Sequence, residues 1–312
     1  MEKQLKYVVL GAGGTGGPIG GYLTRAGKDV TLIARGRHLE AMRKEGLKAH
    51  TAVYGNFRIY PAKVCTMEEY QGCPDVVFVC VKYYSLEECI PFLQRVCGSH
   101  TVIIPILNVF GTGALLQERL PEYTVLDGCI YIYAKIEKPG TVVQPSPIFR
   151  VFFGYREEQE HREEQKLRQV EADLNAAGIE GHFTETVRRD SLQKFSYVSP
   201  MGAAGLYCDA VAGDFMEPGK KQDLVVALIR EIEELGRAMG LEFEGDLVEI
   251  NMKILHGLEK DADTSMQRDV AAGKPSEIEG LVHQVVQLGD RYGLEMPAYR
   301  KISRWAREKG IR

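Results

Sequence analysis

The pattern of apolar and polar positions changes in character along the chain. In the first half, short apolar runs at 7–10, 29–34 and 75–81 alternate with amphipathic stretches. The run at 75–81 is apolar almost throughout, which is typical of a strand buried on both faces of a parallel sheet. From Val187 onward the apolar period is helical almost everywhere. The pattern predicts an α/β domain with a parallel sheet covered by helices, followed by a mainly α-helical domain.

Local signals place several further elements. Ser85 has an acid three residues later, Glu88, which is the spacing of a capping box and predicts a helix start. The apolar run 102–107 predicts another strand, although Pro105 is unusual inside one. A later β segment is expected to end near Gly154.

The charged stretch 156–166 continues into an apolar stripe and predicts a solvated helix with one narrow buried face. We place the domain boundary near 183–187, which gives a dinucleotide-binding domain over 1–184 and a helical domain over 185–312. No internal repeat or low-complexity segment interrupts either part.

The first apolar run leads directly into a glycine-rich turn. Gly11, Gly13 and Gly16 have the GxGxxG spacing, and Gly14 lies in the same turn. In such a motif the first glycine allows the tight turn, the second lets a phosphate approach the backbone, and the third lets the helix pack on the strand. Unpaired amides at the helix start then face the anion. The strand, the turn and the helix together predict a dinucleotide-binding site.

The residues after the second apolar run indicate which dinucleotide binds. A cofactor without a 2′-phosphate is usually met there by an acidic side chain, but Arg35 and Arg37 occupy this part of the chain. A guanidinium can bind the 2′-phosphate through paired donors, whereas a carboxylate would repel it. The sequence therefore favours NADP(H) over NAD(H) or FAD. The alternative, that both arginines are solvated loop residues, stays open.

Composition narrows the class of partner. The chain has 312 residues, enough for two domains, and its 39 basic and 43 acidic residues give a net charge of -4. This balance does not indicate the excess of positive charge that binds nucleic acid or an anionic membrane. No apolar run reaches the roughly 20 residues that cross a bilayer, and the N-terminus has no signal-peptide pattern. We expect a cytoplasmic protein with a small-molecule ligand, no nucleic-acid partner and no membrane association.

The cysteines and histidines argue against a metal or a disulfide framework. Seven cysteines are odd in number and form no CxxC motif, which predicts reduced, mostly buried thiols. The seven histidines do not cluster with cysteines or carboxylates at metal-ligand spacing. We therefore expect no metal.

One ordered set of motifs resembles a known family. Lys82 and Asn108 each follow an apolar run, 192–195 (LQKF) opens the helical half, and 265–269 (SMQRD) and 276–280 (SEIEG) come later. The set resembles the ketopantoate reductase family over almost the whole chain. The resemblance implies a Rossmann domain and a helical domain like the C-terminal domain of 6-phosphogluconate dehydrogenase, enclosing NADPH and a 2-oxo acid. It also implies reduction of 2-dehydropantoate (ketopantoate) to pantoate in pantothenate biosynthesis. A homodimer stays open.

The resemblance also implies roles for single residues. Lys194 would be the general acid, Glu277 would bind a substrate hydroxyl or the lysine, and Ser265 would bind the substrate carboxylate. Lys82 and Asn108 would lie where cofactor and substrate meet, with Asn108 near the nicotinamide. The residues implied to hold the dinucleotide are Gly11, Gly13, Gly14, Gly16 and Arg35. The chemistry is coherent, because hydride addition to a ketone develops oxyanion charge that a lysine can neutralise and protonate.

Three positions depart from the family pattern. Val198, Gly202 and Ala262 stand where family members usually carry asparagine. Since hydrogen bonds select a hydroxylated substrate, this difference bears on whether ketopantoate is the substrate. The residues considered as replacements are Ser196, Tyr197 and Ser199. The alternatives are a reductase of another branched or aryl 2-oxo acid, and an NADP(H)-binding sensor without turnover.

Overall fold

The computed structural model describes residues 4–312, which form two compact units. The first unit runs up to Leu107 and continues over Gly111–Val187. The second unit consists of Asn108–Phe110 and Arg188–Arg312. A three-residue segment from the first half of the chain thus belongs to the second unit.

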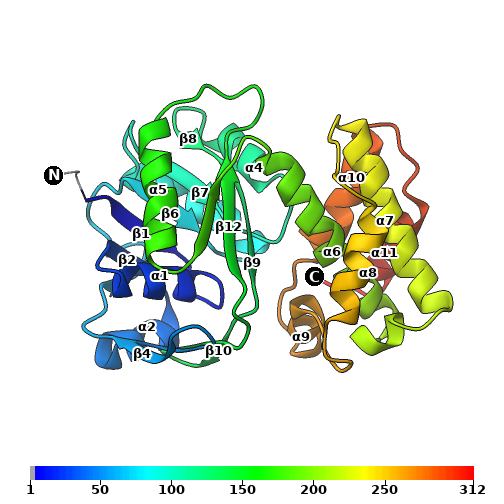
Figure 1. Ribbon diagram of the computed structural model, residues 1–312, viewed down its shortest axis with the longest axis horizontal. Helices are drawn as coiled ribbons and strands as arrows, with labels where there is room; N and C mark the ends of the chain where they lie inside the picture. Colours follow the sequence, from blue (N-terminus) through cyan, green and yellow to red (C-terminus); the bar gives the residue numbers. More distant parts are fainter. Residues whose placement is uncertain (1–3) are drawn as a thin grey trace. The chain divides into compact units, whose positions relative to one another are not determined.

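The first unit is built on a six-stranded sheet in which every neighbouring pair is parallel (Figure 1). In spatial order its strands are β5 (Val64–Cys65), β2 (Asp29–Ile33), β1 (Lys6–Leu10), β6 (Val76–Val79), β7 (Val102–Pro105) and β8 (Thr124–Val125). From β1 the chain builds outward first on one side and later on the other. In such sheets ligands bind beyond the carboxyl ends of the strands at this reversal. The predicted Rossmann-type fold is confirmed.

Both faces of this sheet are buried under helices. The helices of the unit are α1 (Gly16–Arg25), α2 (Gly36–Glu45), the 3₁₀ turn η1 (Tyr83–Ser85), α3 (Leu86–Val96), α4 (Thr112–Arg119) and α5 (Glu164–Ala176). Val9 and Phe78 enter the core that α1 and α5 cover, whereas Leu10 and Val79 enter the core that α3 and α4 cover. Because side chains alternate along a strand, burial on both faces requires the continuous apolar runs seen in the sequence.

Two smaller sheets complete the first unit. Their orders are β10-β11-β3-β4 and β13-β12-β9. The strands are β3 (Leu47–Thr51), β4 (Gly55–Ile59), β9 (Asp127–Ile132), β10 (Lys135–Lys138), β11 (Thr141–Gln144), β12 (Phe149–Gly154) and β13 (Glu180–Phe183). The β segment expected to end near Gly154 is β12.

The second unit is helical, which confirms the predicted fold of the C-terminal part. Its elements are α6 (Val187–Cys208, whose first residue ends the first unit), η2 (Ala212–Phe215), α7 (Lys220–Ala238), α8 (Leu247–His256), α9 (Ser265–Ala271), the π-helical turn η3 (Glu279–His283), α10 (Gln284–Arg291) and α11 (Pro297–Glu308). The helical stripe predicted to stop at Gly240 is α7, and Gly240 has φ 75°.

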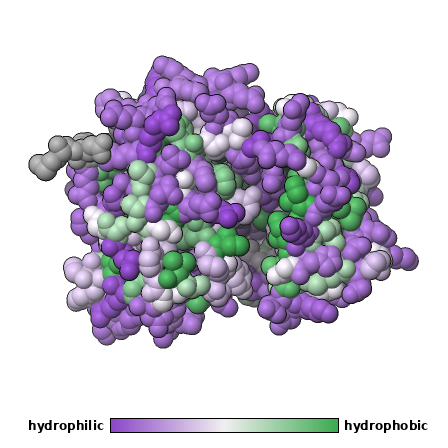
Figure 2. Space-filling model, in the orientation of Figure 1, coloured by the Kyte–Doolittle hydropathy of each residue, from purple (hydrophilic) through white to green (hydrophobic). Residues whose placement is uncertain are grey.

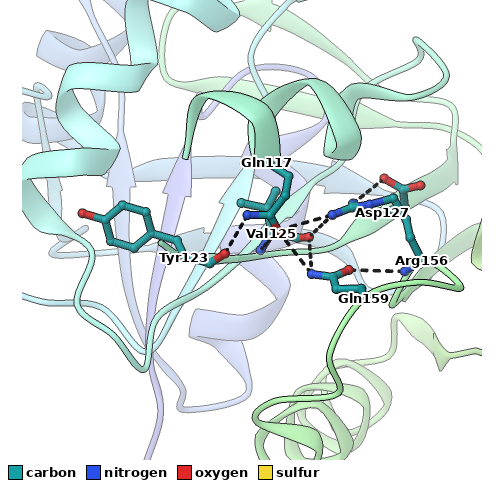
Figure 3. A network of polar contacts seen from close by, with 6 residues as sticks. All are labelled: Gln117, Tyr123, Val125, Asp127, Arg156 and Gln159. Atoms are coloured by element: carbon teal, nitrogen blue, oxygen red, sulfur yellow. Dashed lines mark hydrogen bonds and ion pairs between the residues drawn. The ribbon is translucent and has the colours of Figure 1, made fainter. Parts of the chain in front are cut away.

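The helix predicted over 156–166 begins only at Glu164. The residues before it form a loop held by a polar network near the edge of the main sheet (Figure 3). Arg156 donates to Asp127 Oδ1 at 3.0 Å and to the carbonyl of Val125 at 2.9 Å. Arg156 and Gln159 bind neighbouring strands, whereas Glu157 and Glu158 are exposed on the loop, so the prediction of a helix is wrong for 156–163.

Two further local predictions are only partly right. The helix start predicted at Ser85 is confirmed, because α3 begins at Leu86 with Ser85 as its N-cap, but the Ser85 side chain makes no capping bond. All seven cysteines are free, but only Cys89 and Cys129 are buried, and Cys73 is exposed. Several lie at the ends of elements, such as Cys65 at the end of β5, where packing covers a side chain incompletely.

Hydrophilic residues cover most of the face drawn in Figure 2, with small hydrophobic areas among them. Within residues 4–312, we find no helix that is both long and apolar enough to cross a membrane. The same residues contain no group of three or more His, Cys, Asp or Glu side chains placed to hold a metal ion. The expected absence of a metal stays a prediction.

Candidate active site

The glycine-rich turn follows β1, at the centre of the main sheet. Gly11 has φ 99°, a backbone conformation that favours glycine. The amides of Gly11 and Ala12 both donate to the carbonyl of Ile33, at 3.1 and 2.9 Å. The turn is thereby tied to the end of β2, on the side of the sheet where a dinucleotide binds in this fold.

The other glycines of the turn have different neighbours. A Cβ at Gly16 would lie 2.2 Å from the carbonyl oxygen of Gly11, so the start of α1 packs directly on the turn. A Cβ at Gly14 would lie 3.0 Å from the carbonyl oxygen of Ala134. A Cβ at Gly13 would meet nothing within 4 Å. Gly16 is therefore required by packing and Gly14 is tightly packed, whereas Gly13 leaves open space beside the backbone.

This open side fits a phosphate. In the part of the chain that the structure describes, no backbone carbonyl accepts a hydrogen bond from the amides of Gly13, Gly14 or Thr15. Amides at a helix start with the positive end of the helix dipole behind them bind anions. The turn therefore has the donors and the space that a dinucleotide pyrophosphate needs.

Arg35 follows β2 and occupies the N-cap position of α2. Its side chain is 78% exposed, and its nearest carboxylate is that of Glu88, with 3.7 Å between Nη1 and Oε2. An exposed ion pair at this distance holds a guanidinium only weakly. The guanidinium at the end of β2 is exposed and weakly paired, and its predicted role in binding the 2′-phosphate stays a prediction.

Lys82 and Asn108 follow β6 and β7 respectively. Lys82 is half-buried, with an extended backbone just before η1. Asn108 is also half-buried, but it belongs to the second unit. The two residues predicted to lie where cofactor and substrate meet thus follow adjacent strands of one sheet but belong to different units.

The segment Asn108–Phe110 is held by α6 and α10. Lys194 of α6 donates from Nζ to Asn108 Oδ1 at 2.7 Å. The rings of Phe110 and Phe195 have centroids 6.2 Å apart, and Gln284 Nε2 donates to the carbonyl of Phe110 at 3.2 Å. The structure therefore brings together Lys194 and Asn108, which are 86 residues apart in the chain.

Lys194 is 8% exposed, although lysine is almost never fully buried without partners. Its position depends on the helix turn that follows it. Pro200 has no N–H to donate to the carbonyl of Ser196, four residues earlier. Asn251 of α8 replaces that donor: its Nδ2 lies 3.1 Å from the carbonyl and 2.8 Å from Oγ of Ser196.

Asn251 is 2% exposed and was not among the residues predicted from sequence. A buried asparagine within the apolar stripe of a helix was the signal that could have revealed it, because a buried amide needs partners.

Ser265 and Glu277 lie in separate parts of the second unit. Ser265 is the first residue of α9, whose N-terminus is capped by Thr264. Glu277 is only 3% exposed and precedes η3, where its carbonyl accepts from the amide of Leu281 at 2.8 Å. Ser276 Oγ accepts from the amide of Ile278 at 3.4 Å, so Glu277 also lies where an acid would stabilise the start of a helix. A carboxylate buried at this position is nevertheless a candidate for chemistry.

The replacements considered for the missing amides are mostly engaged elsewhere. Ser199 Oγ donates to the carbonyl of Leu281 at 2.6 Å and lies 2.5 Å from Tyr299 Oη. Ser196 Oγ donates to the carbonyl of Gln193 at 2.6 Å. Both hydroxyls stabilise helix packing, so the prediction that they replace the amides is wrong. Burial raises the pKa of Tyr197 to about 12, so it stays neutral and able to donate.

Comparisons with known proteins show the family of this chain. The family model described as "Ketopantoate reductase PanE/ApbA" matches residues 7–158, and the model of the C-terminal part of that family matches residues 186–310. The chain belongs to the ketopantoate reductase family. Enzymes of this family are NADP-dependent oxidoreductases that act on CH–OH groups, which confirms the predicted enzyme class and the cofactor NADP(H).

Individual relatives are distant but cover the whole chain. A 2-dehydropantoate 2-reductase of Aquifex aeolicus is 26% identical over 98% of this chain and 97% of its own, and an uncharacterized oxidoreductase, YkpB, of Bacillus subtilis is 26% identical over 94% and 95%. The structure of a 2-dehydropantoate 2-reductase from Methylococcus capsulatus has a TM-score of 0.85 at 21% identity, covering 98% of this chain and 97% of its own. A D-mandelate dehydrogenase with NADH and anilino(oxo)acetate has a TM-score of 0.86 at 18% identity, covering 98% of both chains. These two structures share the fold.

Proposed function

We propose that this ketopantoate reductase family member reduces a 2-oxo acid to a 2-hydroxy acid with NADPH, and that 2-dehydropantoate is the first substrate to test. The observation that carries the proposal is the hydrogen bond from Lys194 Nζ to Asn108 Oδ1 at 2.7 Å. It joins a buried lysine to the residue that follows a strand of the dinucleotide-binding sheet. An amine held there is suited to proton transfer at a reacting carbonyl.

The cofactor end of the proposal rests on the first unit. NADPH, when bound, supplies the hydride. The amides of Gly13 and Gly14 bind the pyrophosphate, and Arg35 binds the 2′-phosphate through its guanidinium. Lys82, which follows β6, contributes a cation where the cofactor meets the substrate. These residues fix the cofactor without taking part in a bond change.

The substrate end rests on the second unit. Lys194 Nζ donates a hydrogen bond to the substrate carbonyl oxygen and gives it a proton as negative charge develops there. Asn108 holds that amine in place until the substrate takes over its hydrogen bond. Ser265 binds the substrate carboxylate, and Glu277 accepts from a substrate hydroxyl or from Lys194.

A second substrate class is supported by the face of α6 that carries Lys194. One and two turns beyond the lysine lie Val198 and Gly202, neither of which has a polar side chain. A Cβ at Gly202 would lie 3.1 Å from Cε of Met266, so this part of the helix faces an apolar neighbour. An apolar face favours a branched or aryl side chain over a hydroxylated one. The D-mandelate dehydrogenase of the same fold is named for an aryl hydroxy acid.

The test is NADPH oxidation with ketopantoate, 2-oxoisovalerate and phenylglyoxylate, beside a Lys194→Ala control. Lys194-dependent turnover of ketopantoate would support the first substrate. Turnover of 2-oxoisovalerate or phenylglyoxylate without turnover of ketopantoate would show that the substrate has a branched or aryl apolar side chain. NADPH binding without turnover of any 2-oxo acid would contradict a reductase and favour a sensor of NADP(H).

Three further properties depend on this proposal. A role in pantothenate biosynthesis follows if ketopantoate is the substrate, and a cytoplasmic location is the expectation for such a biosynthetic enzyme. A homodimer is supported by a Staphylococcus aureus ketopantoate reductase of the same fold, which is described as dimeric. Sedimentation of the purified protein tests that state directly.

A further inference from the structure

His38 of α2 has both ring nitrogens engaged with backbone groups. Its Nε2 lies 2.9 Å from the carbonyl oxygen of Ala12, and its Nδ1 lies 3.0 Å from the amide nitrogen of Gly140. An amide N–H can only donate and a carbonyl can only accept. Nδ1 is therefore the acceptor and Nε2 carries the hydrogen, so the two backbone partners fix one neutral tautomer of the ring.

The two partners belong to segments that also touch directly. Gly140 forms the turn between β10 and β11, and a Cβ there would lie 2.9 Å from Cβ of Ala41 in α2. A Cβ at Gly17 would lie 2.9 Å from Cγ1 of Val142 in β11. The glycine-rich turn, α2 and the β10–β11 hairpin therefore pack without space for another side chain.

The carbonyl of Ala12 has a special place in the turn. It belongs to the peptide unit whose N–H is that of Gly13, and in a planar trans peptide the C=O and the N–H point in opposite directions. A hydrogen bond that holds the carbonyl toward His38 therefore turns the Gly13 N–H away from His38. This is the amide beside the open space where a Cβ would meet nothing within 4 Å.

We propose that His38 is a positioning residue for the cofactor: by holding the Ala12 carbonyl against the β10–β11 hairpin, it aims the Gly13 amide at the dinucleotide phosphate. The inference rests on the proposed binding of NADPH at this turn, but not on the identity of the 2-oxo acid. His38 touches neither the cofactor nor the reacting atoms. Its loss is expected to weaken cofactor binding and to leave the chemical step unchanged.

The environment of His38 keeps the ring in this form. Burial lowers the pKa of His38, and the hydrogen bond to Ala12 opposes that shift without reversing it. A neutral ring is required, because a second hydrogen on Nδ1 would oppose the Gly140 N–H.

The test is the Kd of NADPH, measured by cofactor fluorescence on the apoprotein, for the wild type, His38→Leu and His38→Gln. Leucine removes both bonds, and we expect Kd to rise about tenfold, the effect of one or two neutral hydrogen bonds. Glutamine can donate from Nε2 and accept at Oε1, and we expect it to recover Kd to within about threefold of the wild type. His100→Ala, an exposed histidine of the same unit, is the matched control.

Steady-state kinetics separate positioning from a general loss of structure. At saturating NADPH, kcat of His38→Leu should stay within about twofold of the wild type while KM for NADPH rises. A lower melting temperature with an unchanged Kd in the folded fraction would overturn the inference, as would a glutamine variant no better than leucine. If the wild type binds NADPH but reduces no 2-oxo acid, the proposed reaction fails, whereas the Kd comparison still decides the role of His38.

Discussion

The two candidate functional regions, the glycine-rich turn of the first unit and the lysine end of the second unit, differ in how they are built. The turn is made of backbone: its open space, and its amides without a backbone acceptor among the described residues, come from residues adjacent in the chain. The lysine end of the second unit is made of side chains from distant elements. Lys194 is fixed through Asn108 after β7, and its helix turn is completed by Asn251 of α8.

This difference implies different sensitivities to substitution. In the turn, a single added methyl group changes the path of the backbone or the space for a phosphate. At the lysine end, a side chain can be exchanged without moving the backbone, so the chemistry can change while the fold stays. The apolar Val198 and Gly202 beside Lys194 are an example of such an exchange.

The largest expected effects come from one substitution at each end, which should affect turnover and cofactor binding separately. Lys194→Ala removes the proposed proton donor, and we expect kcat to fall about 10²- to 10⁴-fold with the Kd of NADPH unchanged. Gly13→Ala adds a methyl group to open space, so we expect unchanged melting temperature but NADPH binding weakened about tenfold or more. Single-turnover kinetics and fluorescence titration measure the two quantities.

Lys253→Ala is the matched control for the lysine variant, because Lys253 is exposed on α8. If Lys194→Ala weakens NADPH binding as much as it slows turnover, the assignment of cofactor binding to the turn and of proton transfer to the lysine end is wrong.

The next effect tests whether the turn is set by packing. Alanine is normally more favourable than glycine in a helix by about 1 kcal/mol. At Gly16, however, its Cβ would lie 2.2 Å from the carbonyl oxygen of Gly11 and 2.8 Å from Cγ1 of Val9. We expect Gly16→Ala to lower the free energy of unfolding by about 1–3 kcal/mol, the cost of overpacking, and to weaken NADPH binding as well. Urea denaturation of Gly16→Ala beside Gly13→Ala measures this, and equal stability of the two variants would contradict it.

A smaller effect concerns the choice of cofactor. Arg35→Ala removes the exposed guanidinium after β2, and we expect NADPH affinity to fall about 10- to 100-fold, as for a lost charged hydrogen bond. NADH affinity should change less than about threefold, because NADH has no 2′-phosphate for a guanidinium to pair with. The loss should shrink at high salt, since the pair is exposed.

Arg37→Ala, two residues further along, separates the neighbours. If Arg37→Ala lowers NADPH affinity and Arg35→Ala does not, the 2′-phosphate is bound two residues further along the chain than we propose.

The contrast between the ends also explains what the sequence could predict. The turn and the strand before it are local, so the spacing of Gly11, Gly13 and Gly16 was enough to indicate their place and their neighbours. The continuous apolar runs predicted the parallel sheet for the same reason. The loop 156–163 was missed because Arg156 and Gln159 bind strand residues that lie about 30 positions earlier in the chain, Val125 and Asp127.

The lysine end could be found only through the resemblance to a family. On its own, Lys194 is one lysine in a long helix, and nothing nearby in the sequence shows that it is buried. Its contact with Asn108 spans 86 residues, and the donor that compensates for Pro200 comes from α8. No local spacing encodes such contacts.

The smallest expected effect concerns Asn251, whose side chain donates to the carbonyl of Ser196 in place of the missing N–H of Pro200. Asn251→Leu keeps the branched shape and the number of heavy atoms of the side chain but leaves the carbonyl of Ser196, which Pro200 cannot serve, without its donor. The expected loss in the free energy of unfolding is about 1–2 kcal/mol, the lower part of the range for an unsatisfied buried acceptor. The loss is limited because Asn251 Oδ1 is itself buried without a hydrogen-bond partner among the described residues, and leucine removes that atom as well.

Asn251→Asp should be worse than leucine, because a carboxylate cannot donate and is buried as a charge. Since Ser196 lies two residues from Lys194, either variant should lower kcat more than it changes the Kd of NADPH. Urea denaturation and steady-state kinetics on the same preparations measure both. If Asn251→Leu is as stable as the wild type and kcat is unchanged, the turn after Lys194 is held by helix packing alone, and the lysine end depends on fewer side chains than the geometry indicates.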